Sequence, residues 1–133
     1  MRKNLGFTLL EMLVVIGIIA VLVSMGFVSY STAQKKTRDA KRKLELSAIK
    51  NAMEQYYSLC NGSYPLTEGG KVPFSIVTAQ PGCTADENIM QAVPLDPKDQ
   101  VTRYDYDDFG PPPQICASIM ESEPAPYCVN LQQ

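Results

Sequence analysis

The sequence predicts an α+β protein. One long N-terminal helix, membrane-spanning in its first half and amphipathic in its second, would carry a small C-terminal antiparallel β-sheet domain of about three to four strands. Residues 6–28 are almost entirely apolar. Apolar residues then keep a helical spacing up to residue 60, and all ten prolines lie after Tyr64. Beyond them, short runs alternate between apolar and polar residues and are separated by turn-forming residues.

The apolar stretch from Gly6 to Val28 is the first element. Arg2 and Lys3 precede it, Glu11 is the one acid inside it, and no further charge appears before Lys35. Such a stretch is long enough to cross a bilayer as a helix, which takes about 20 apolar residues. Positive charge before it keeps the N-terminus in the cytoplasm, so the rest of the chain would face outward. An acid inside a membrane segment is costly, which makes Glu11 a candidate functional residue.

Two simpler interpretations of this stretch stand beside that one. A secretory signal peptide could be cleaved near Ser31-Thr32-Ala33, but its apolar core has about 7–15 residues, and Glu11 lies where that core should be apolar. The stretch could also be a plain membrane anchor with no role in assembly.

The second half of the helix covers residues 35–60. Apolar residues recur near every 3.6 positions, which predicts one face turned to a small domain: Ala40, Leu44, Ala48 and Leu46, Ile49, Met53, Tyr56, Cys60. Charged residues are expected on the opposite, solvent-facing side: Arg38, Lys41, Arg42, Glu45 and Lys50. Asn61-Gly62 forms a favourable left-handed cap and should end the helix.

Two motifs carry a resemblance to a known family. Gly6-Phe7-Thr8-Leu9-Leu10-Glu11, after a basic leader, resembles the class III signal of type IV pilins and type II secretion pseudopilins. Asn61-Gly62-Ser63-Tyr64-Pro65 is similar to the signature at the end of the family's helix, so the resemblance covers residues 1–65. Many members carry a proline where this chain has Val28. A continuous helix is therefore favoured, and any loosening would have to start at Gly26.

The resemblance implies how the N-terminus is processed. A membrane peptidase would cleave between Gly6 and Phe7, and Phe7 would then be N-methylated. The amine of Phe7 on an incoming subunit would meet Glu11 of a neighbour, and this pair would set the register of stacked helices. The chain would divide into a leader (1–6), a transmembrane and filament-core helix (7–34), an amphipathic helix (35–60) and a globular loop and β-sheet domain (61–133).

The implied function is that of a structural, non-enzymatic subunit of a type IV pilus-like filament, serving adhesion, motility or DNA uptake. A pseudopilin of a type II secretion system is the alternative within the family, and a monomeric membrane-anchored extracytoplasmic binding domain is the alternative from another class. The implied partners are other copies and other pilins, a prepilin peptidase, and an inner-membrane assembly platform with its ATPase. The chain would reside in the inner membrane before assembly and in a cell-surface fibre afterwards.

Charge is unevenly distributed along the chain. From Lys35 to Lys50 there are seven basic residues against two acids, whereas from Asn51 onward there are three against eleven. A basic collar and an acidic C-terminal domain could suit contact between stacked subunits, and a solvated surface explains the pattern equally well. Direct nucleic-acid binding is not predicted, because phosphate contacts need clustered Lys and Arg.

Four cysteines in an exported domain indicate disulfides. The simplest pairing follows chain order, Cys60 with Cys83 and Cys116 with Cys128, and the second pair is like the C-terminal staple of many pilins. The other two connectivities stay open.

The C-terminal residues predict short elements. A strand is expected within residues 72–79, confined to a sheet edge by Pro73. A capping box over residues 84–87 predicts a helix of about two turns ahead of Ile89 and Met90. Three strands are expected over residues 103–107, 115–120 and 127–131.

No catalytic motif is present in the sequence, which has no His, no GxSxG and no P-loop. No metal or other cofactor is expected by default, and the acidic residues of the C-terminal half are interpreted as a solvated rim. Calcium is the alternative, since oxygen-rich clusters can bind it and the resemblance implies a site in this part of the fold: Asp96, Asp99, Asp105, Asp107 and Asp108.

Overall fold

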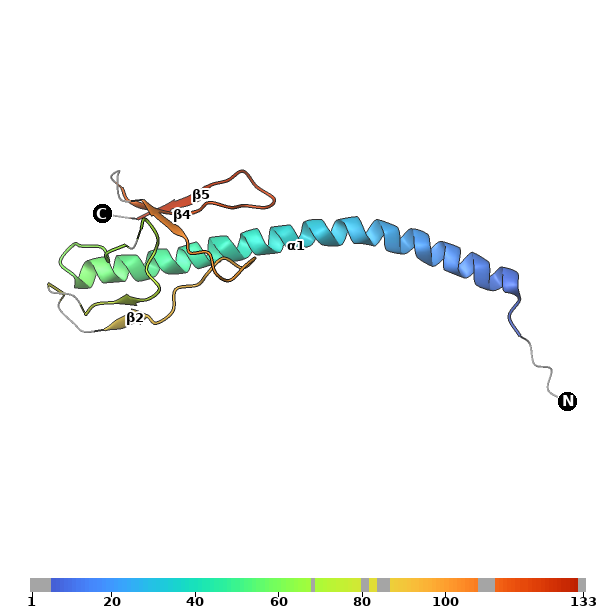
Figure 1. Ribbon diagram of the computed structural model, residues 1–133, viewed down its shortest axis with the longest axis horizontal. Coiled ribbons are helices and arrows are strands. Elements are labelled where there is room, and N and C mark those ends of the chain that lie inside the picture. The colour runs from blue at the N-terminus through green and yellow to red at the C-terminus, as the bar shows by residue number, and fades with distance from the viewer. Residues whose placement is uncertain (1–5, 68, 80–81, 84–86, 108–111, 132–133) are drawn as a thin grey trace. The chain divides into compact units, whose positions relative to one another are not determined.

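The computed structural model describes residues 6–67, 69–79, 82–83, 87–107 and 112–131 (Figure 1). The chain forms two compact units, Met1–Lys35 and Lys36–Gln133; the second is called the head below. Within these ranges, helix α1 is followed by five short strands, so the α+β class is confirmed: α1 (Leu9–Leu59), β1 (Ile76–Val77), β2 (Asn88–Met90), β3 (Asp105–Asp107), β4 (Gln114–Ala117) and β5 (Tyr127–Asn130).

Helix α1 ends at the predicted Asn-Gly cap. The Gly62 amide donates to the Tyr57 carbonyl at 3.0 Å, and the Ser63 amide donates to the Cys60 carbonyl at 3.2 Å. Asn61 has a φ of 53° and Gly62 a φ of 76°, so both lie in the left-handed region. This is a Schellman-type end, which satisfies carbonyls of the last turn that would otherwise lack partners.

The strands form two sheets among the described residues. β3, β4 and β5 make an antiparallel sheet in that order, with Cys116 of β4 opposite Cys128 of β5. β1 and β2 pair separately, also antiparallel. In Figure 1, β2 and the β4–β5 pair lie on opposite sides of the C-terminal part of α1, so this part of the helix runs through the head. Such short strands need a helix against them to be stable.

The core of the head is built on one stripe of α1. Leu46, Ile49, Met53 and Tyr56 are each at most 1% exposed and follow a three-four spacing. Strand and loop residues complete the same cluster: Val72, Ile76, Val93, Tyr104, Tyr106, Ile115, Ala117 and Leu131. By contrast Ala40, Leu44 and Ala48, which the periodicity assigned to the core face, are exposed. Their spacing of four residues drifts away from the buried stripe.

The predicted short helix after residue 84 is wrong. Residues 84–86 lie outside the described residues, and Asn88–Met90 is strand β2. Thr78 explains the difference, because its amide donates to the Glu87 carbonyl at 2.9 Å and its Oγ1 accepts from the Glu87 amide at 2.6 Å. These bonds hold the segment against β1, and strand pairing outweighs a local capping signal.

Two disulfides brace the head. Cys60 is bonded to Cys83, and Cys116 is bonded to Cys128, which is the pairing in chain order. The first ties the end of α1 to the loop before β2, and the second links two neighbouring strands. Each closes a short loop, and such a bond typically adds about 2–4 kcal/mol of stability.

We expect Leu46→Ala to lower the free energy of unfolding of the head by about 2–5 kcal/mol, because it empties a fully buried site. Leu44→Ala is the matched control, two residues away and 72% exposed, and should change it by no more than about 0.5 kcal/mol. Urea titration of the detergent-solubilised protein, followed by tyrosine fluorescence, measures both. Equal losses in the two variants would contradict the observed core face.

Candidate functional site

Glu11 closes a capping box at the start of α1. The Thr8 amide and the Thr8 Oγ1 both donate to Glu11 Oε2, at 2.8 and 2.9 Å. The Glu11 amide donates back to Thr8 Oγ1 at 3.2 Å. Thr8 is therefore the N-cap residue, which explains why the helix begins at Leu9. The carboxylate gains two hydrogen bonds in this arrangement, and it forms no ion pair with any of the described residues.

Gly6 and Phe7 lie just before the helix, outside any helix or strand. Phe7 is 79% exposed, and apart from the chain neighbours of Gly6 no described residue lies within 4 Å of where a Cβ on Gly6 would be. A peptide bond in such an open segment is accessible to a peptidase. Leader residues 1–5 lie outside the described residues, and cleavage at this bond stays a prediction.

The first half of α1 presents apolar side chains on all sides. By length and composition α1 can cross a membrane, and the other residues that the structure describes bury none of its most apolar window. The large apolar side chains of residues 9–27 are between 44% and 82% exposed. A helix that is apolar all round needs lipid or other helices as its surroundings.

Arg42 is the centre of a buried charge cluster in the head. Its guanidinium donates to Asp96 through Nε at 2.7 Å and Nη2 at 2.9 Å, and to Asp39 Oδ1 through Nη1 at 2.6 Å. Nη2 also lies 3.3 Å from Glu121 Oε1. Arg38 holds the same Glu121 carboxylate with two hydrogen bonds of 2.7 and 2.6 Å. These five residues, Arg38, Asp39, Arg42, Asp96 and Glu121, are called the clasp below.

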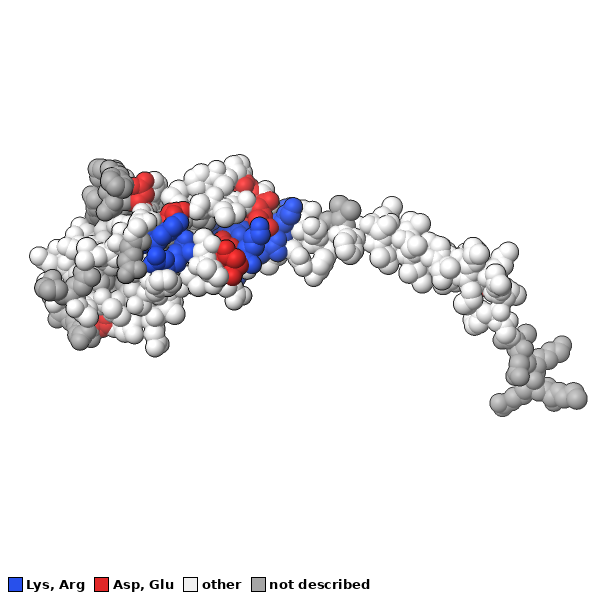
Figure 2. Space-filling model, viewed as in Figure 1, with Lys and Arg blue, Asp and Glu red and all other residues white. Residues whose placement is uncertain are grey.

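The clasp fixes two loops on α1. Asp39 accepts hydrogen bonds from the amides of Glu121 and Ser122 and from the Ser122 hydroxyl. Beside the clasp, Lys43 pairs with Glu123 at 2.6 Å. On the face drawn in Figure 2, Lys and Arg side chains lie next to Asp and Glu side chains over this part of the head. Much of the basic charge of α1 is therefore neutralised within the same chain.

The clasp shifts the pKa values of its members. Burial alone would raise the pKa of the Asp39 carboxyl, but the bonds from Ser122, Glu121 and Arg42 together lower this pKa to about 2. The bonds from Arg38, and then from Arg42, lower the pKa of Glu121 to about 2 against the effect of burial. The hydrogen bonds with Asp96 raise the pKa of Arg42 above its usual value. All three groups stay charged at neutral pH.

The prediction that Arg42 faces solvent is wrong, because its side chain is fully buried. The sequence did contain a signal for this. Residues 39, 42, 46, 49, 53, 56 and 60 follow one three-four spacing, so Asp39 and Arg42 continue the apolar stripe toward the N-terminus. A charge on a buried stripe implies a partner of opposite charge, but the identity of Asp96 and Glu121 as partners required the fold.

Most of the acidic residues considered for calcium have other partners within the chain. Asp96 belongs to the clasp, Asp99 caps the turn at Val101 and Thr102, and Asp105 contacts Lys71 and Ser118. Asp107 lies on β3 opposite Gln114, and Asp108 lies outside the described residues. Among the described residues, no group of three or more His, Cys, Asp or Glu is placed to hold a metal ion.

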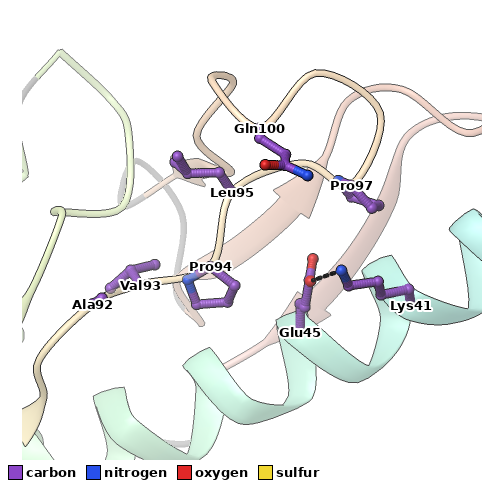
Figure 3. A pocket seen from close by; sticks show the side chains of 8 residues that line it. All are labelled: Lys41, Glu45, Ala92, Val93, Pro94, Leu95, Pro97 and Gln100. Carbon is purple, nitrogen blue, oxygen red and sulfur yellow. Dashed lines mark ion pairs between the residues drawn. The ribbon is translucent and has the colours of Figure 1, made fainter.

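A groove runs between α1 and the loop of residues 92–100 (Figure 3). On the helix side, Lys41 and Glu45 form an ion pair of 3.7 Å, and the Tyr104 hydroxyl also donates to Glu45. The loop side is mostly apolar: Ala92, Val93, Pro94, Leu95, Pro97 and Gln100. The Glu45 carboxylate is thus engaged twice within the chain.

We expect Arg42→Met to lower the stability of the head by about 3–5 kcal/mol, because it leaves buried carboxylates without their counter-charge. Lys43→Met is the neighbouring control. It breaks a half-exposed pair and should cost no more than about 1 kcal/mol. Thermal unfolding followed by circular dichroism measures both variants. A loss below 1 kcal/mol for Arg42→Met would show that the clasp is not an essential stabilising contact.

Acid should weaken the head through the same groups. The folded-state pKa values of Asp39 and Glu121 lie near 2, below their ordinary values of 3.8 and 4.5. Their stabilisation is therefore fully present above about pH 4.5 and is lost as the pH falls toward 2. Urea midpoints measured across this range should fall steeply in the wild type and less steeply in Asp39→Asn with Glu121→Gln. Parallel curves would contradict this assignment.

The N-terminal residues match a known family motif. Residues 1–27 match the family described as "Prokaryotic N-terminal methylation motif". This match spans the leader, Gly6, Phe7, Glu11 and most of the apolar segment.

Longer matches extend into the head. The chain is 32% identical over 99 residues to the type II secretion system core protein G of Aeromonas hydrophila, covering 72% of this chain and 68% of that protein. It is 34% identical over 98 residues to the protein of the same name from Escherichia coli strain K12, covering 71% and 67%. The one from Vibrio cholerae serotype O1 is 37% identical over 70 residues, covering 53% of this chain and 47% of that protein.

No solved structure matches the chain significantly. The methylation motif, the apolar helix that follows it and the relatives that extend into the head agree with one another. The chain belongs to the pilin and pseudopilin family that includes the type II secretion system core protein G.

Proposed function

We propose that this chain is a structural subunit of a pilus-like filament, and that this filament is a pseudopilus of the type II secretion kind. The observation that carries the proposal is the exposed apolar half of α1, with a single carboxylate at its start. The name of these relatives, type II secretion system core protein G, favours a secretion pseudopilus over a pilus for adhesion, motility or DNA uptake.

The apolar half of α1 supplies the driving force. Each large aliphatic side chain gains about 1.5–3 kcal/mol when it leaves water. The inner membrane provides such surroundings before assembly, with Arg2 and Lys3 keeping the N-terminus in the cytoplasm. In the filament, the same surface packs against the helices of neighbouring subunits. The head, which is folded around its own core, would then lie outside the apolar bundle.

Glu11 gives this packing its register. Cleavage between Gly6 and Phe7 leaves a charged amine on Phe7, and a charge among apolar helices is costly unless it is paired. The Thr8 amide and hydroxyl survive this cleavage, so the capping box persists in the mature chain with both of its bonds on Glu11 Oε2. We infer that the carboxylate also accepts the Phe7 amine of the next subunit, as a single polar group fixes register in coiled coils.

The proposed function requires several partners. A prepilin peptidase would cleave and methylate the N-terminus, and an inner-membrane platform driven by an ATPase would add subunits. Other copies of this chain and related pseudopilins would form the fibre. The chain itself would act without catalysis.

We expect Glu11→Gln to keep the protein in the membrane, processed to N-methylated Phe7, and to reduce its recovery in sheared fibres by at least about tenfold. The glutamine keeps the size and hydrogen-bonding capacity of the side chain but loses the charge. Mass spectrometry of the N-terminal peptide measures cleavage and methylation. Quantitative immunoblotting of sheared and membrane fractions measures how much of the protein is assembled into fibres.

Thr8→Ala is the matched control, because it removes the hydroxyl of the capping box and leaves Glu11 charged. It should lower fibre recovery by less than about twofold, since a lost cap costs about 1 kcal/mol. An equal loss of fibre recovery in both variants would show that Glu11 acts only as a helix-capping residue. An unprocessed protein whose location is indifferent to Glu11→Gln would instead support a membrane-anchored binding domain.

A further inference from the structure

We propose that Asn61 is a self-modification site: its side-chain amide deamidates when the C-terminal cap of α1 opens, and the Cys60–Cys83 disulfide keeps that cap closed. Asn61 and Gly62 are both exposed, and they form the turn directly after the disulfide-bonded Cys60. This inference concerns the head alone and does not rest on the proposed filament.

The chemistry needs only the chain and water. The backbone nitrogen of Gly62 attacks Cγ of Asn61, so that a new N–Cγ bond forms. The Cγ–Nδ2 bond breaks, and the amide leaves as ammonia with the proton lost from the Gly62 nitrogen. Water then opens the resulting succinimide at either carbonyl and yields aspartate or isoaspartate. Glycine is the most favourable residue after asparagine for this reaction, because it has no Cβ to hinder the attack.

The closed cap opposes the attack in two ways. The attacking nitrogen belongs to an N–H that donates to the Tyr57 carbonyl at 3.0 Å, so the reaction must first break a bond of the helix end. The Tyr57 ring also lies against one side of this turn, since a Cβ on Gly62 would lie 3.4 Å from the phenol oxygen. This ring packs against the Tyr64 ring in a tilted arrangement with centroids 4.7 Å apart, which holds it in place. Only the opened cap is therefore reactive.

The disulfide controls how often the cap opens. Helix ends fray at little cost unless tertiary contacts hold them. Cys60 is 4% exposed, its amide donates to the Tyr56 carbonyl at 2.9 Å, and its sulfur is bonded to Cys83. The residue before Asn61 is thus anchored to the core and to a second segment of the chain.

Aspartate or isoaspartate at position 61 would destabilise the same cap whose closed form prevents the reaction. Either product places a carboxylate at the C-terminal end of a helix, where negative charge is unfavourable. Isoaspartate also adds a backbone atom between Cys60 and Gly62, which displaces the Gly62 amide from the Tyr57 carbonyl. Opening of the cap therefore leads to a lasting chemical change, the conversion of Asn61 to aspartate or isoaspartate.

The test compares the full-length oxidised protein in detergent with Cys60→Ser/Cys83→Ser during incubation at mildly alkaline pH. Proteolysis and mass spectrometry, with fragmentation that distinguishes isoaspartate, follow the peptide that contains Asn61. We expect deamidation at Asn61 to be at least about tenfold faster without the disulfide, since opening of the cap becomes easier. Cys116→Ser/Cys128→Ser, which removes the other disulfide, should stay within about twofold of the wild type, because that bond lies on the sheet.

A second pair of variants keeps the test decisive if Cys60→Ser/Cys83→Ser does not fold. Tyr57→Ala removes the ring that lies against Gly62 and should speed deamidation several-fold, whereas Gln55→Ala, at an exposed site on the same helical turn, should not. Equal rates at Asn61 in the wild type and in these variants would overturn the proposal. So would faster deamidation at Asn51, Asn88 or Asn130 than at Asn61 in the protein without the first disulfide.

Discussion

The buried guanidinium of Arg42 is the interaction on which the arrangement of the head depends. A charge with no exposed surface is tolerated only when opposite charges and hydrogen bonds surround it. Here the partners come from three places in the chain: Asp39 on the same helix, Asp96 in the loop after β2, and Glu121 in the loop between β4 and β5. If either loop moved away from α1, a buried charge would lose its ion-pair partner or become exposed. The clasp therefore limits the ways in which the short strands can be placed.

One helix serves two kinds of surroundings, and the change occurs near residue 36. Before this point, the large apolar side chains of residues 9–27 are exposed, so they need lipid or other helices as their surroundings. After it, one stripe is covered by the head, while charged residues pair with acids of the same chain. This division agrees with the family: the methylation motif matches residues 1–27, and the curated relatives extend the match into the head.

The observed ion pairs change how the uneven charge is interpreted. The basic collar of residues 35–50 and the acidic C-terminal half suggest attraction between stacked subunits. Within one chain, however, Arg38, Arg42 and Lys43 already pair with Glu121, Asp96 and Glu123. These ion pairs within one chain hold loops of the head against α1. The basic residues of the collar therefore mainly stabilise the fold of their own chain. Fewer of them remain to form ion pairs with a neighbouring subunit.

The sequence by itself determined the elements that depend on neighbouring residues. The end of α1 at Asn61-Gly62, its apolar first half and the core stripe from Leu46 to Cys60 all follow from local spacing and propensity. Only the tertiary structure decided which partners lie across the chain. Contacts with Thr78 make the segment after residue 87 a strand, and Leu44 stays exposed. Arg42 is buried, and its partners are the carboxylates of Asp96 and Asp39. These outcomes depend on contacts between residues up to 83 positions apart, as between Arg38 and Glu121, and no local pattern specifies them.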